Sequence, residues 1–132
     1  MSIYTPTIVD SALYPIAVIN PFAVNYYVAE GDPAIELVEA PTGVGEAIYV
    51  THVSMSLYTI LGGDVKITLQ DEDGLVLFGP IQMQENGSSV FQKDWDNPMK
   101  VPDNKALDVF GNVGQVAFWI YVEGFIGDKP IV

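Results

Sequence analysis

Residues 64–83 read DVKITLQDEDGLVLFGPIQM, and this stretch decides the fold. Its first half alternates apolar and polar residues from Val65 to Leu69, which is the pattern of a strand with one buried face. The sequence DEDG at 71–74 then predicts a turn, and the apolar run at 75–83 predicts a second strand. Because a short turn joins neighbouring antiparallel strands, we expect a β-hairpin here.

Strand-like patterns recur on both sides of this hairpin, at residues 23–31, 35–40, 47–57, 106–110 and 115–125. The Asn-Gly pair in the sequence ENGSS predicts one more hairpin. Helical periodicity is hard to find, because 12 glycines and 9 prolines are spread through the chain. About eight strands at short, regular spacing predict an all-β, antiparallel β-sandwich.

Two of these strands have informative faces. In residues 47–57 the alternation predicts one face with Ile48 and Val50, and an opposite face with Tyr49, Val53, Met55 and Leu57. Residues 115–125, QVAFWIYVEGF, are almost continuously apolar. That segment predicts a central strand that is covered on both faces, or covered by a neighbouring subunit.

Residues 1–22 do not follow the strand pattern and predict an extended N-terminal arm before a β-sandwich domain at 23–132. The arm is too apolar to stay in water without a partner. Two alternatives are open, because it can fold back on its own sandwich or lie over a neighbouring protein. The arm residues expected to make these contacts are Ile3, Tyr4, Ile8, Val9, Leu13 and Tyr14.

Charge excludes several classes of partner. The chain has 132 residues and a formal charge of −12, from 17 acidic residues against five lysines and no arginine. Nucleic-acid binding needs clustered basic residues, so neither DNA nor an anionic membrane is an expected partner. The acidity favours pairing with a basic protein surface. No segment reaches the roughly 20 apolar residues of a membrane helix, and the first residues lack a basic signal region.

Reaction chemistry has few candidate residues. His52 is the only histidine and there is no cysteine, which leaves no catalytic triad and no two-histidine zinc site. The acidic turn Asp71-Glu72-Asp73-Gly74 lacks the ligand spacing of a calcium loop and is expected to be a charged hairpin tip. We therefore expect no enzymatic activity, no metal and no cofactor.

The sequence DWDNPMK, at residues 94–100, raises the question of sugar binding, because a tryptophan stands between two carboxylates. On a strand Asp94 and Asp96 share one face, while Trp95 points the other way, into the sandwich. A carbohydrate-binding role stays open as an alternative, with Trp95 or Trp119 as the residue that stacks on the sugar.

Several short motifs follow one another between residues 40 and 126. The corner PTGVGEAIYVTHVSMSL is followed by VKITLQD, by Gly79-Pro80-Ile81 and by Asn86-Gly87. Next comes a spaced pattern, P-x-K-x-P-x-N-x-A-L, formed by Pro98, Lys100, Pro102, Asn104, Ala106 and Leu107. With the closing strand VAFWIYVEGF, these motifs make residues 40–126 resemble tailed-phage capsid decoration (cement) proteins with a jelly-roll fold.

The resemblance implies a jelly-roll sandwich on the outside of a phage capsid, made in the host cytoplasm and stabilising the shell, commonly as a homotrimer. The implied partners are the major capsid protein and further copies of the same chain. The same motifs occur in head fibres and in tail or baseplate modules, so a head-fibre or tail-associated module, or a carbohydrate-binding one, is the alternative.

Overall fold

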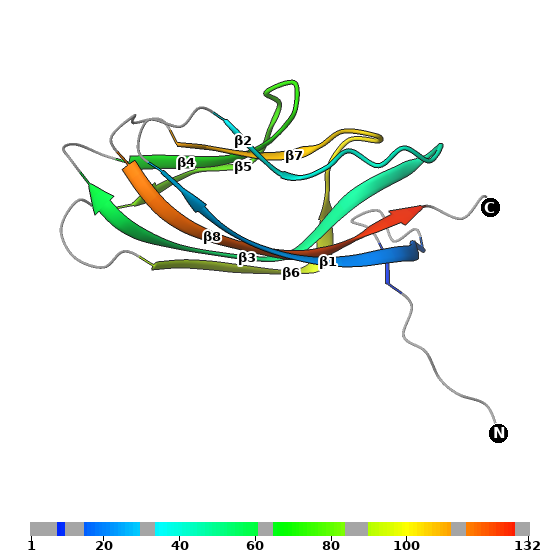
Figure 1. The fold of residues 1–132 in the computed structure, drawn as a ribbon. Coiled ribbons are helices and arrows are strands. Elements are labelled where there is room, and N and C mark those ends of the chain that lie inside the picture. The colour runs from blue at the N-terminus through cyan, green and yellow to red at the C-terminus, as the bar shows by residue number, and fades with distance from the viewer. Residues whose placement is uncertain are drawn as a thin grey trace.

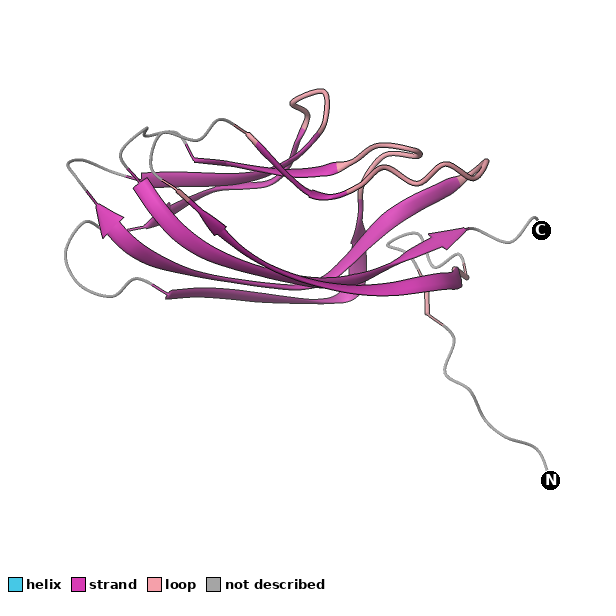
Figure 2. Cartoon of the chain, in the orientation of Figure 1, coloured by secondary structure: helices cyan, strands magenta, loops and turns pink. Residues whose placement is uncertain are grey.

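The computed structural model describes residues 8–9, 15–29, 34–60, 65–83, 90–111 and 116–128. In these ranges the chain forms eight strands in two layers (Figure 1) and no helix (Figure 2). The strands are β1 (Ala17–Val28), β2 (Ile35–Val38), β3 (Glu46–Ile60), β4 (Val65–Asp71), β5 (Val76–Met83), β6 (Val90–Lys100), β7 (Leu107–Gly111) and β8 (Val116–Asp128). Among the described residues, no helix is long and apolar enough to span a membrane.

The strands form two four-stranded antiparallel sheets, in the orders β1-β8-β3-β6 and β2-β7-β4-β5. Figure 1 shows the first sheet below the second. Chain-distant strands lie side by side in both sheets, with β1 beside β8 and β2 beside β7. This is the strand order of a jelly roll, the double-sheet architecture built from two Greek keys. The predicted all-β antiparallel sandwich is confirmed.

Two strands differ from the expectation. β1 begins at Ala17 rather than at residue 23, so residues 17–22, predicted as arm, pair with β8 in the sheet. β6 was not predicted over its whole length, because charged residues interrupt its alternation. It lies at the edge of its sheet and includes Pro98, which an edge strand tolerates because its missing N–H leaves no ladder hydrogen bond broken.

The main core lies between the two layers, where the inward faces of both sheets meet. Its fully buried side chains include Ile48, Val53, Ile67, Leu69, Leu107 and Phe118. The β4–β5 hairpin contributes to this core as predicted, because Ile67 and Leu69 of β4 share the buried face. Phe78 of β5 packs against the same core.

A β-bulge changes the faces of β3. The register of β3 shifts against both β6 and β8 between Val50 and His52. An extra residue at that point returns the following side chains to the inner face, so Val53 and Met55 join Ile48 and Val50 in the main core. The predicted grouping of Tyr49 with Val53, Met55 and Leu57 is therefore wrong.

Tyr49 instead packs on the outer side of the sheet, in a small second cluster with Ile16, Ala47 and Phe125. Its ring stacks on Phe125 at a centroid distance of 5.3 Å. β8 is a central strand, as predicted, and this end of its outer face is covered by the second cluster. Farther along the same strand, Trp119 is 46% exposed.

Candidate functional site

Three loops are tied together by residues of the P-x-K-x-P-x-N-x-A-L pattern. Lys100 Nζ pairs with Asp103 at 2.8 Å, while Pro98 and Leu107 are buried. Asn104 reaches the corner before β3, where its Nδ2 donates to the carbonyl oxygens of Pro41 and Gly43 at 2.9 and 2.7 Å. The pattern therefore positions the connection between the two sheets.

Replacing Asn104 with alanine is expected to destabilise the fold by about 2 kcal/mol, because two hydrogen bonds are lost and the residue has a φ of 59°. Asn104→Gly tolerates that φ and loses only the hydrogen bonds, for which we expect about 1 kcal/mol. Urea denaturation of both variants measures the two contributions. Equal destabilisation by alanine and glycine would contradict a role for the backbone conformation.

The acidic turn 71–74 belongs to the same loop cluster. Asp71 is buried, and its Oδ1 accepts hydrogen bonds from the backbone N–H groups of Asp73 and Leu75, both at 2.9 Å. Glu72 accepts from the Ala106 N–H at 3.0 Å, and Asp73 pairs with Lys105 at 2.8 Å. The hydrogen bond to Asp73 raises the pKa of Lys105. Each carboxylate of the turn thus has a structural partner, and among the described residues no cluster fits a metal ion.

The predicted arm is only partly within the described residues. Ile3, Tyr4, Leu13 and Tyr14 lie outside the described ranges. Ile8 is 38% exposed, and its carbonyl oxygen accepts a hydrogen bond from the Ile16 N–H at 2.9 Å. Val9 forms an isolated β-bridge with Pro15. The chain just before β1 is therefore tied to the start of that strand.

The two tryptophans lie on opposite faces of the same sheet. Trp95 of β6 packs against the main core, edge-on to Phe78 at a centroid distance of 5.1 Å. Asp94 and Asp96 are exposed, so Trp95 and the two carboxylates diverge as the alternation predicts. Trp119 faces outward from β8. The two rings thus cannot form one platform for a sugar.

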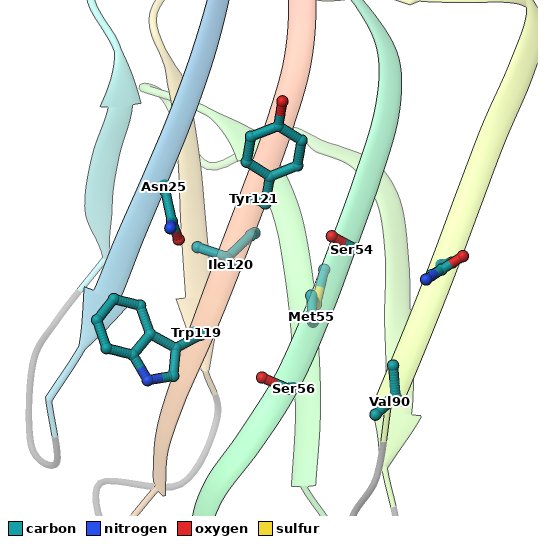
Figure 3. A pocket seen from close by; sticks show the side chains of 9 residues that line it. Asn25, Ser54, Met55, Ser56, Val90, Trp119, Ile120 and Tyr121 are labelled. Carbon is teal, nitrogen blue, oxygen red and sulfur yellow. The ribbon is translucent and has the colours of Figure 1, made fainter.

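The outer face of the first sheet carries an open depression of ≈ 280 Å³ beside Trp119 (Figure 3). Ser54 and Ser56 lie on β3 between Trp119 and Tyr121 of β8 on one side and Val90 of β6 on the other. The small serines make the floor low, while larger residues form its walls. We call this surface the outer aromatic face, and its residues include Asn25, Tyr27, Ser54, Ser56, Trp119 and Tyr121.

Pairing of distant strands builds this face. The register places Tyr27 opposite Trp119, and their rings are 5.0 Å apart at 51°. Ser54 lies opposite Tyr121 and Ser56 opposite Trp119. Trp119 was a candidate in the sequence, whereas the other residues were not. The alternation of Trp119 and Tyr121 along one strand was the available signal, but their neighbours depend on the register between strands.

Charged groups begin where the outer aromatic face ends. The Tyr121 hydroxyl makes a hydrogen bond with the Glu123 carboxylate, which raises the pKa of Tyr121. His52 Nδ1 lies 2.7 Å from Asp94 Oδ1, and the imidazole is tilted against Tyr121 at 5.9 Å. His52 is thus held at the border of the face by a carboxylate.

A second group of carboxylates lies on the other sheet, away from the outer aromatic face. Asp108 of β7 lies opposite Glu36 of β2 in the strand register. The Asp108 Oδ1 atom is buried without a hydrogen-bond partner in the described part of the chain. Burial raises the pKa of Asp108, with smaller contributions from the negative charges of Glu36, Glu72 and Asp71. The folded protein therefore binds this proton more tightly than the unfolded chain.

Asp108→Asn is expected to stabilise the protein at pH 7 by about 0.5–1 kcal/mol, a small gain because solvent screens a partly exposed carboxylate. Stability from the protonated group is fully present below the unfolded pKa of 3.8 and is lost as the pH rises through the higher folded pKa. The gain should therefore disappear below pH 3.8. Thermal unfolding across pH measures it, with Asp96→Asn as a control for the general loss of one negative charge. An equal gain in the control would contradict the local explanation.

Comparison of the sequence with protein-family models and with curated proteins finds no match.

Proposed function

We propose that the protein is a non-enzymatic structural protein of a tailed-phage virion, which binds the outside of the capsid as a decoration or cement protein and stabilises the shell as a homotrimer. The observation that carries the proposal is an agreement between motif and fold. The segment 40–126 carries the resemblance, and it contains β3 to β7 and most of β8 of an eight-stranded jelly roll. The fold by itself would not be sufficient, because one architecture serves many functions.

The surface chemistry supports the same proposal. A formal charge of −12 favours a partner with a basic surface and speeds its association at low salt. Binding by several copies at once multiplies a weak contact, which suits a shell with many equivalent sites. The apolar N-terminal residues give each copy a further segment for contact with its neighbours. Ile8 belongs to this segment and is 38% exposed.

Removing residues 1–14 is expected to leave the sandwich folded and to abolish or strongly weaken capsid binding. This boundary keeps the whole of β1, which begins at Ala17, and the buried Ile16 before it. Co-sedimentation with capsid shells stripped of the protein measures binding, and far-UV circular dichroism checks the fold. Ile8→Ser serves as a milder variant of the same segment. Undiminished capsid binding by the truncated protein would contradict the role of the arm.

A second candidate function is carbohydrate binding on the virion, and the exposure of Trp119 beside polar Asn25 and Ser54 favours it. The discriminating measurement is tryptophan fluorescence of a Trp95→Phe variant, which reports on Trp119 alone. Quenching by a neutral hexasaccharide would favour this candidate. An unchanged spectrum across hexasaccharides of glucose, xylose, mannose and N-acetylglucosamine would exclude it.

A further inference from the structure

The outer aromatic face is uncharged in a protein that is otherwise strongly acidic. Asn25, Ser54 and Ser56 are polar without charge, and Tyr27 and Trp119 expose 37% and 46% of their surface. Val90, which lines the same depression, is 65% exposed. Large exposed apolar side chains that lie together on one face mark an interaction site.

The adjoining edge of the sheet has the same character. β1 is an edge strand of 12 residues, AVINPFAVNYYV, without a single charge. The opposite edge, β6, carries Lys93, Asp94, Asp96 and Lys100, the kind of charges that prevent edge-to-edge association. On β1, by contrast, Val18, Ile19 and Tyr26 are exposed by 39–49%. The β1 edge, next to Asn25 and Tyr27 of the outer aromatic face, is therefore uncharged as well.

Charge identifies the occupant of this surface. Copies that each carry a formal charge of −12 repel one another wherever their carboxylates face. An uncharged surface allows close contact between copies without this repulsion, and this face and edge provide one. A basic partner would instead bind the acidic surface elsewhere, because the outer aromatic face offers it no carboxylate. A saccharide would occupy the depression and leave the apolar β1 edge uncovered.

We propose that the outer aromatic face and the adjoining β1 edge form the contact between copies of this chain, with Trp119 as its anchor. This inference rests on the trimer in the proposed function and gives it a place on the molecule. The surface has two different parts, a depression floored by Ser54 and Ser56 and an edge with protruding Ile19 and Tyr26. Contact of the edge of one copy with the depression of the next is heterologous, and three such contacts form a closed trimer when the rotation between copies is 120°.

The test is the mass of the full-length protein by light scattering and by sedimentation over a dilution series. Trp119→Glu places a charge in the anchor, where a central tryptophan typically contributes at least 2 kcal/mol, so the dissociation constant should rise about 30-fold or more. Val44→Glu adds the same charge at a loop residue that is 98% exposed and should leave the mass unchanged. Ser56→Glu, in the floor of the depression, is the second variant if Trp119→Glu does not fold by circular dichroism.

Salt gives an independent prediction. Because the copies repel one another through their carboxylates, added sodium chloride screens the repulsion and should tighten the association. The inference is overturned if Trp119→Glu and Ser56→Glu keep the mass of the wild type, if the wild type is monomeric at every concentration, or if a neutral hexasaccharide quenches Trp119 in a monomer. Capsid binding separates the two proposals. A wild-type trimer that does not bind capsids would contradict the proposed function alone. A Trp119→Glu variant that remains a trimer and binds capsids would contradict this interface alone.

Discussion

Gly124→Ala is expected to destabilise the protein by about 3 kcal/mol, at the upper end of the range for overpacking. Gly124 lies in central β8, between Phe22 of β1 and Val50 of β3. A Cβ atom at this residue would collide with the backbone carbonyl oxygen of Tyr49 and come within 2.8 Å of the Phe22 ring. The carbonyl belongs to the paired strand beside the β3 bulge, so it cannot turn away as a side chain would.

Urea denaturation followed by far-UV circular dichroism measures this effect. Gly111→Ala is the matched control, because a Cβ there meets only the Phe118 ring at 3.4 Å, an ordinary contact. The control should stay within about 0.5 kcal/mol of the wild type or gain slightly from reduced chain entropy. If both variants were equally stable, the close approach of β3 and β8 at Gly124 would be refuted.

Phe118→Ala is expected to destabilise the protein by about 3–5 kcal/mol, the usual result of removing a fully buried phenylalanine. Phe118 is 0% exposed and points from β8 into the main core. Its removal leaves a cavity beneath the sheet that carries the outer aromatic face. Because the total stability of a domain is only about 5–15 kcal/mol, this loss should lower the urea midpoint of unfolding strongly.

The neighbouring residue supplies the control for this prediction. Trp119→Ala changes the next side chain on the same strand, which points to the other face and is 46% exposed. Measured at high dilution, where association contributes least, Trp119→Ala should change the free energy of unfolding by less than about 1 kcal/mol. A loss as large as that of Phe118→Ala would mean that Trp119 belongs to the core of a single chain.

Much of the fold follows from alternation along the sequence, and the errors have physical causes. The hairpin of β4 and β5 was predictable because Ile67 and Leu69 alternate with polar residues. The face on which Tyr49 lies was not predictable, because the β3 bulge inserts one residue and the apolar alternation of the sequence does not reveal it. The early start of β1 was missed because Pro21 suggests a break, although an edge strand tolerates proline.

The candidate site was less predictable than the fold. The inward direction of Trp95 followed from the flanking Asp94 and Asp96. The outward direction of Trp119 did not follow, because the apolar residues of β8 are nearly continuous and fit either face. The pairing of Trp119 with Tyr27 requires the register between the first strand and the last, and no local pattern contains that information.

Quantitative mass spectrometry of purified virions tests the proposal that the chain is a structural component of a phage head. As a head component, the protein should be present in a fixed ratio to the major capsid protein. The same ratio should persist in heads that are separated from their tails. Absence of the chain from purified virions, or its presence only in the tail fraction, would refute the proposed function.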